Sequence, residues 1–309
     1  MPGLNNVWSG QCLGSALPGS CVRFGQSPAR RILFSMTDLA ARPVETLREH
    51  ATALEAALAV CLGDPRPKAV HKLRTETRRV EAQLLLLDRM HGLPSFRKEA
   101  AKVRRHLKKL RRAAGRVRDL DVQHKLLKIE ETRPAARRDA GLMAKLRKER
   151  RDEAVEELLE QLVKRQAKLA NALEALLEAL EPAEHLELAP TEVLAIAERQ
   201  FRNTRELKVQ KPTTDQLHTL RKTAKVARYL AENAPGSRRA KQTAKRYESL
   251  QQAGGEWHDW MELAKDAGEE LGRDHALVDV FGRKCERHLN RFQKLLQPFQ
   301  ESRRELPLK

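Results

Sequence analysis

The chain has 309 residues, of which 40% are hydrophobic and 33% are charged, and its formal net charge is +18. A chain of this length and hydrophobic content can bury a sizeable core, while the excess of Lys and Arg favours a polyanionic partner. Aromatic residues make up only 4%, which argues against proteins that stack single-stranded bases on aromatic rings. No apolar run approaches 18 residues, so we expect no membrane span and no membrane partner.

Residues 1–42 differ from the rest of the chain because they are rich in Gly, Ser and Pro and show no helical periodicity. We predict that they form a disordered leader. The segment lacks the continuous apolar run of a secretory signal, and its acid-free stretch with Arg23, Arg30 and Arg31 leaves a mitochondrial presequence as the weaker alternative. Met36 opens a stretch that resembles an ordinary protein start, so a misplaced initiation site is a further alternative.

The four cysteines are scattered, at positions 12, 21, 61 and 285, and they form no CxxC pair and no His/Cys cluster at zinc spacing. Isolated thiols in a chain of this size are typical of a reducing compartment, so we expect a cytoplasmic protein without a metal site or another cofactor. Cys61 and Cys285 lie in helical patterns, where we expect them to act as small buried hydrophobic residues.

From residue 43 to the end, apolar residues recur at helical spacing and no segment alternates as a strand does, so we predict an all-α fold. We expect helices at about 43–62, 67–90, 96–114, 115–130 and 141–180, then at about 191–207, 214–233, 238–253, 256–271 and 274–297. The expected N-caps are Ser95, Thr191 and Ser237. Gly115 and Gly254-Gly255 are expected to break two helices, and Pro298 is expected to end the last one.

Two segments recur in the second half of the chain in the same order. Val70–Leu87 returns in degenerate form at Leu217–Leu230, and Leu107–Val122 returns at Tyr247–Leu263. The matched positions are His71 with His218, Arg74 with Arg221, Arg78 with Lys225, Leu110 with Leu250, Gly115 with Gly255 and Asp119 with Asp259. Such a recurrence indicates an internal duplication. We therefore predict two pseudo-symmetric antiparallel helical bundles, at about residues 43–180 and 190–309.

The first duplicated segment carries a stripe of hydrogen-bond donors. At 3.6 residues per turn, His71, Arg74 and Arg78 share one helix face, and His218, Arg221, Lys225 and Arg228 repeat the stripe in the second copy. Mostly cationic donors one turn apart suit a ligand with regularly spaced negative charges.

The second duplicated segment is also basic in its first copy. Its stripe comprises Lys98, Lys102, Arg105, Lys109, Arg112 and Arg116, flanked by Lys108, Arg111 and Arg118. The second copy offers only the weaker counterparts Lys241 and Lys245. Basic charge is concentrated here, because His71–Lys128 holds 18 Lys/Arg against 6 Asp/Glu, whereas Leu146–Gln200 holds 8 against 13. A surface that only keeps a protein soluble would mix the two signs.

These four segments resemble the CHAD domain (conserved histidine α-helical domain) family. The first copy has Val70-His71-Lys72-Leu73-Arg74 with Arg78-Arg79, then Leu110, Gly115 and Arg118-Asp119; the second has Leu217-His218-Thr219-Leu220-Arg221 with Lys225, then Leu250, Gly255 and His258-Asp259. The resemblance covers roughly residue 43 to the C-terminus. It departs from the pattern where Val226 replaces Arg79 and Gln251-Gln252 replace Arg111-Arg112.

The resemblance implies one domain over residues 43–309 with a basic central cavity that binds inorganic polyphosphate, in the cytoplasm or at polyphosphate granules. The side chains that we expect to bind this ligand lie in the four segments: His71, Lys72, Arg74, Arg78, Arg79, Arg105, Lys108, Lys109, Arg112, Arg116, Arg118, His218, Arg221, Lys222, Lys225, Arg228, Lys241, Lys245 and His258.

Other interpretations remain for the same residues. A histidine such as His71, taken alone, is more often a capping or core residue than a ligand, and Asp119 and Asp259 are expected to orient Arg118 and His258. Trp257 and Trp260 are expected in the core. The first alternative function is non-specific binding of nucleic acid, as in a nucleoid protein. The second is an enzyme with a nucleophilic histidine, which we consider weaker because no general acid or metal-holding carboxylates accompany the stripes.

Overall fold

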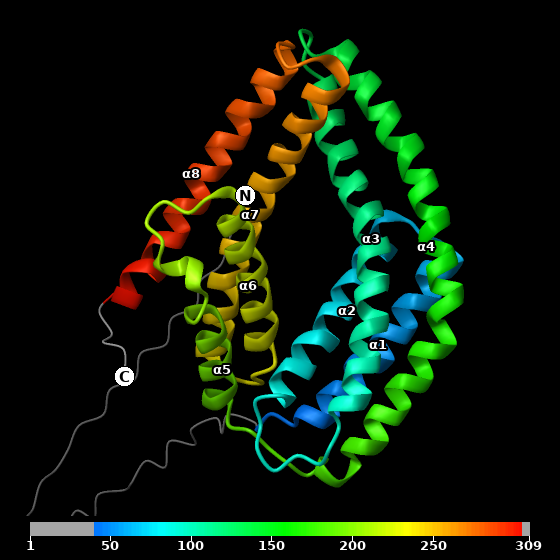
Figure 1. Ribbon diagram of the computed structural model, residues 1–309, viewed down its shortest axis with the longest axis vertical. Coiled ribbons are helices and arrows are strands. Elements are labelled where there is room, and N and C mark those ends of the chain that lie inside the picture. Colours follow the sequence, from blue (N-terminus) through cyan, green and yellow to red (C-terminus); the bar gives the residue numbers. More distant parts are fainter. Residues whose placement is uncertain (1–39, 305–309) are drawn as a thin grey trace, which may run out of the picture. The chain divides into compact units, whose positions relative to one another are not determined.

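The computed structural model describes residues 40–304, which belong to one compact unit (Figure 1). The helices are α1 (Pro43–Gly63), α2 (Pro67–Leu87), α3 (Arg97–Glu131), α4 (Arg137–Leu180), α5 (Pro190–Arg202), α6 (Thr214–Glu232), α7 (Arg238–Leu271) and α8 (Ala276–Arg304), with short 3-10 helices at Glu181–Ala183 and Arg205–Lys208. The described residues form no strand, and the predicted all-α class is confirmed. The predicted leader lies, up to residue 39, outside the described residues.

Each half of the unit has its own apolar core. In the first half, leucines of α1 and α2, among them Leu54 and Leu73, pack with Leu107 of α3 and Leu173 of α4. In the second half, Phe201 of α5 packs with residues of α6, α7 and α8, which include Leu220, Tyr247, Trp257 and Phe292. Trp257 and Trp260 are 2% and 7% exposed, so their predicted core placement is confirmed. These cores bury the apolar face of every long helix and fix which faces remain free.

The two halves contact each other through two further apolar clusters. One cluster joins Leu86 of α2 to Val193 of α5 and Leu230 of α6. The other joins Leu127 of α3 and Met143 of α4 to α7 and α8. The helices α2 and α6, which carry the two copies of the first motif, are also in direct contact. The duplicated segments are therefore packed against each other rather than held apart by a linker.

Buried charges reinforce the contact between α3–α4 and α7–α8. Arg147 of α4 is fully buried and donates to Gln123 at 2.8 Å, to Glu270 at 2.7 Å and to Asp266 at 3.1 Å. Lys284 of α8 pairs with buried Glu130 and lies 4.3 Å from the ring centre of Trp260. Removing one partner from such a buried pair leaves an uncompensated charge, so these contacts hold the two halves in a fixed arrangement.

Several predicted helix boundaries are wrong. Gly115 and Gly254-Gly255 do not break helices, because α3 and α7 run through them without interruption. Pro298 lies inside α8 rather than ending it. Of the expected N-caps, Ser237 accepts a hydrogen bond from the backbone N–H of Ala240, as predicted. The other two were wrongly placed, since α3 begins after Phe96 and α5 begins after Ala189.

The glycines in α3 and α7 provide space for arginine side chains. A Cβ atom at Gly115 would lie 2.9 Å from Nη1 of Arg74. A Cβ atom at Gly254 would lie 3.1 Å from Cγ of Arg221 and 3.0 Å from the ring of Phe292. The sequence comparison paired Gly115 with Gly255, but Gly255 has no atom near its missing Cβ. Gly254 is therefore the glycine that faces the motif arginine in the second half.

We expect Gly254→Ala to destabilise the protein by about 1–3 kcal/mol relative to Gly255→Ala, because the added methyl group overpacks a closed site. Phe292 is fully buried and stacks on Trp257 with ring centres 6.0 Å apart, so it cannot move aside freely. Gly255→Ala is the matched control, since it gains about 0.5–1 kcal/mol of helix preference without a clash. Denaturant unfolding measures both variants. Equal stability of the two would contradict this role of Gly254.

Candidate anion-binding site

The structure brings four cations of the two motif helices together: Arg74 and Arg78 of α2 with Arg221 and Lys225 of α6. We call these four residues the cation cluster. All four are half-buried. Burial and then the positive charge of Arg78 lower the pKa of Arg74 to about 10, and Arg221 contributes to the same lowering. The pKa of Lys225 lies well below its ordinary value because of burial and then the charges of Arg78, Arg221 and Arg74. Cations from both halves therefore share one site.

Few negative groups compensate the cation cluster. Asp119 of α3 approaches Arg74 with 3.7 Å between Oδ1 and Nη1, rather than pairing with its neighbour Arg118 as the sequence suggested. Asp259 of α7 has its pKa raised to about 6, first by burial, and the charge of Arg221 counters that rise. Nε of Arg221 is buried and has no hydrogen-bond acceptor among the described residues. Four cations facing two carboxylates and one unsatisfied guanidinium nitrogen form a site to which an anion would be attracted.

Three histidines surround the cation cluster. Burial, together with the charges of Arg118 and Arg74, lowers the pKa of His71. His218 packs 4.9 Å from Trp257 and 4.7 Å from His258, measured between ring centres. The pKa of His258 falls to about 3, first through burial and then through Arg221 and His218. Without a ligand, the histidines are therefore neutral at pH 7, and each can donate one N–H to an oxygen.

Other predicted ligand residues are engaged elsewhere. Lys72 and Arg79 both pair with Glu76, which is fully buried, at 2.6 and 2.9 Å. Arg116 pairs with Glu157 of α4. Arg228 pairs with Glu232 at 2.8 Å and with Glu248 at 3.0 Å. Of the remaining predicted cations, Arg118 is half-buried, and seven are exposed on their helices: Arg105, Lys108, Lys109, Arg112, Lys222, Lys241 and Lys245.

The sequence analysis did not identify Tyr229 as part of the site. Its hydroxyl group interacts with Arg78, and this interaction partly offsets the lowering of the arginine pKa by burial. Its ring packs with the apolar cluster that joins α2 to α5 and α6. The one available signal was its position directly after Arg228 in the second motif helix, and that position alone does not distinguish a core tyrosine from a ligand-binding one.

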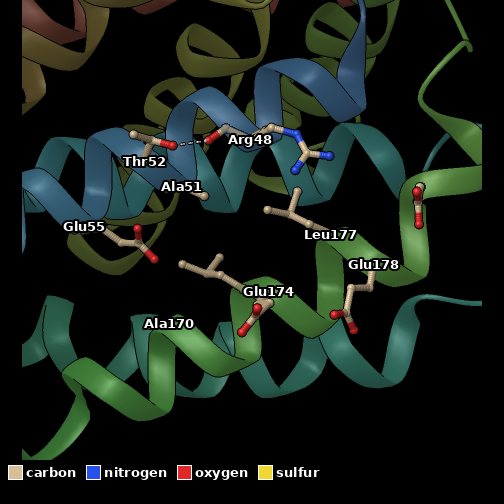
Figure 2. A pocket seen from close by; sticks show the side chains of 10 residues that line it. Arg48, Ala51, Thr52, Glu55, Ala170, Glu174, Leu177 and Glu178 are labelled. Carbon is tan, nitrogen blue, oxygen red and sulfur yellow. Dashed lines mark hydrogen bonds between the residues drawn. The ribbon is translucent and has the colours of Figure 1, made fainter.

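Two hollows near the first-half helices differ in charge. The hollow between α1 and α4 has a volume of about 430 Å³, and glutamates line it, including Glu55, Glu174 and Glu178 (Figure 2). Its only basic lining residue, Arg48, pairs with Glu184. A second hollow of about 670 Å³ includes His71 and Arg118 in its lining. The positive charge of the second hollow suits an anion, whereas the negative charge of the first hollow does not. The expected basic central cavity stays a prediction.

No group of three or more His, Cys, Asp or Glu among residues 40–304 is arranged to hold a metal ion. In the same part of the chain, no helix has both the length and the apolar character needed to cross a membrane. Cys61 is a buried free thiol, and burial raises its pKa to about 11, so its predicted core role is confirmed.

Comparisons with known proteins agree with this architecture. The family model of the CHAD domain matches residues 45–265. The crystal structure of the CHAD domain from the plant Ricinus communis is similar, with a TM-score of 0.60 and 18% identity, over 92% of this chain and 98% of that chain. PptA from Streptomyces chartreusis is 17% identical over 85% of this chain and 98% of that chain, with a TM-score of 0.48. Among curated proteins, no significant match was found.

We expect Lys225→Met to raise the melting temperature of the ligand-free protein at pH 7, by roughly 2–4 °C for each kcal/mol of repulsion that it removes. The pKa of Lys225 is lower in the folded than in the unfolded state. The unfolded state therefore binds more protons between the two pKa values, and wild-type stability increases with pH in that window. The advantage of the variant should thus shrink as the pH rises toward the pKa of an unfolded lysine.

Lys265→Met is the control for this prediction, because Lys265 lies exposed on α7 and its contact with Glu269, at 3.9 Å, is a surface pair. Surface pairs contribute about 0–1 kcal/mol, so the melting temperature should hardly change. A lower melting temperature of Lys225→Met at pH 7 would show that the amine is stabilised in the folded state, contrary to the arrangement described.

Proposed function

Because the chain belongs to the CHAD domain family, as its duplicated motifs predicted, we propose that it binds inorganic polyphosphate and catalyses no reaction on it. The observation that carries this proposal is the cation cluster, in which α2 and α6 present four half-buried cations with few counter-charges. Arginine binds phosphate oxygens through two parallel hydrogen bonds, and lysine adds a point charge. We further propose that the protein acts in the cytoplasm, at polyphosphate granules.

The position of the cations favours a slender ligand. Because the cluster is half-buried between two helices, only a narrow chain can bring its charges to all four residues. Duplex DNA presents phosphates on a wide cylinder and is read by elements inserted into a groove about 12 Å wide. Single-stranded nucleic acid binds by stacking on exposed aromatic rings, but Trp257 and Trp260 are buried. Polyphosphate needs neither a groove reader nor a stacking platform.

The proposal of binding without catalysis follows from how the acidic groups near the cluster are used. Enzymes that transfer phosphoryl groups hold divalent metal ions with carboxylates. The carboxylate of Asp119 lies beside Arg74, and that of Asp259 interacts with Arg221. Both acids therefore serve the arginines, which hold an anion without activating it.

We expect the affinity for polyphosphate to fall steeply with salt, because each neutralised phosphate releases counterions and contributes about 0.7 to the slope of log K against log salt. Engagement of the cation cluster should give a slope of several units in a titration at a series of salt concentrations. Competition with duplex and single-stranded DNA is the companion measurement. A flat salt response would contradict the electrostatic mechanism, and tighter binding of either DNA would support the nucleic-acid alternative.

We expect Arg74→Ala with Arg78→Ala to weaken polyphosphate binding more than Arg221→Ala with Lys225→Ala, since the first pair removes two guanidinium groups and the second only one. A hydrogen bond to a charged group contributes about 1.5–3 kcal/mol, so each double variant should lose at least about tenfold in affinity. Calorimetry on folded protein at one salt concentration provides the comparison.

Arg137→Ala with Arg138→Ala is the matched control for the double variants, because it removes two exposed positive charges at the start of α4. Its affinity should stay near that of the wild type. An equal loss in the control would mean that net charge alone governs binding. Unchanged affinity in both test variants would place the site away from the motif helices.

A further inference from the structure

A basic hollow lies beside the cation cluster on the first half of the protein. It has a volume of about 670 Å³, within the usual range of ligand sites, and lies between the start of α2, the middle of α3 and the first half of α4. Its lining includes His71 and the positive charge of Arg118 from the motifs, together with Lys68, Lys125 and Lys148, which lie outside the predicted set. The hollow thus extends the positive surface beyond the motif residues.

The hollow adjoins the cation cluster electrostatically. After burial, the charges that lower the pKa of His71 are those of Arg118, Arg74 and Arg78, in that order. Arg118 also contributes to the lowered pKa of Arg74. His71 and Arg118, which line the hollow, therefore lie close enough to the cation cluster for their charges to interact.

Positive charge is in excess in the hollow, whose lining has five Lys or Arg side chains against the two carboxylates of Asp121 and Asp152. Asp121, whose side chain is only 5% exposed, pairs with Arg151 at 2.6 Å, so these two opposite charges offset each other. Among residues 40–304, no carboxylate oxygen lies within 4.0 Å of the amino groups of Lys68, Lys125 or Lys148. Exposed lysines without partners are flexible point charges that can follow a mobile phosphate chain.

The second half of the protein differs at the corresponding positions. There, His218 is covered by Trp257 and His258, whereas the first half has Val117 and Arg118 at the positions of these two rings. Asp215 occupies the position of Lys68, and Lys265, at the position of Lys125, approaches Glu269 at 3.9 Å. In the second half, an acid thus stands in place of Lys68, and aromatic rings cover the motif histidine, whereas Lys125 has a lysine as its counterpart.

From this asymmetry, we propose that a polyphosphate chain held by the cation cluster leaves it through the first-half hollow only, with Lys68, Lys125 and Lys148 as additional phosphate contacts. This inference rests on the proposed function of the same site. It assigns the additional contacts of long chains to residues outside the duplicated motifs. The bound polyphosphate would run along α2 toward the N-terminus of that helix, where free backbone N–H groups also favour an anion.

The test compares tripolyphosphate with long-chain polyphosphate on Lys125→Ala with Lys148→Ala in the full-length protein. The affinity for the long chain should fall about tenfold, and its salt slope should drop by about 0.7 for each lysine that had neutralised a phosphate. The loss for tripolyphosphate should be several times smaller, because the cation cluster alone can hold a short chain. Lys265→Ala with Lys294→Ala, which removes two exposed lysines of the second half, is the control and should leave both affinities near wild type.

Lys68→Asp provides a second test, because it gives the first half the residue type found at position 215. Lys68 lies in the first turn of α2, where an acidic residue favours the helix, so the variant should fold normally. It should also weaken binding of the long chain more than that of tripolyphosphate. Unchanged long-chain affinity and salt slope in both variants, or an equal loss in the control, would overturn the proposed route while leaving polyphosphate binding intact. Failure of the wild type to bind either ligand would overturn the proposed function itself.

Discussion

The contact between the positive faces of α2 and α6 is the constraint on which the rest of the structure depends. Arg74, Arg78, Arg221 and Lys225 are half-buried and repel one another, so their contact is unfavourable by itself. Apolar packing of Leu86 with Val193 and Leu230 offsets this repulsion beside the site. At the far ends of α3, α4, α7 and α8, apolar residues and the buried pairs of Arg147 and Lys284 hold the two halves together. The favourable contacts are thus separated from the unfavourable ones.

The mutual repulsion of the four cations makes the site unfavourable for as long as no counter-charge neutralises it. The lowered pKa values of Lys225 and His258 both show that the ligand-free site disfavours positive charge. A bound polyanion would supply counter-charges, so it should favour the protonated forms of Lys225 and His258 and weaken the repulsion among the cations. Asp119 and Asp259 moderate the repulsion, which explains why two carboxylates occur beside the four cations.

The sequence predicted the helical class, the duplicated segments and the residues of the cation cluster, because spacing alone places those side chains on one helix face. It did not predict the role of the glycines. A glycine in a helical pattern weakens the helix, so the sequence predicts breaks at Gly115 and at Gly254-Gly255. In the structure, long helices run through these positions. Gly115 and Gly254 leave space for the side chains of Arg74 and Arg221. Packing against neighbouring helices outweighs the local preference, and no local rule reports that packing.

The sequence by itself determined that this protein is helical, duplicated and strongly positive along two segments, because helical periodicity and charge are local properties of the chain. Only the tertiary structure decided which of those charges act together. Lys72 and Arg79 lie within two residues of cluster residues in the sequence, yet the buried Glu76 pairs with both of them. Lys68, Lys125 and Lys148, by contrast, come from three helices and line one hollow. The reason is physical: the environment of a side chain depends on the elements packed around it, and a sequence pattern describes only its own helix.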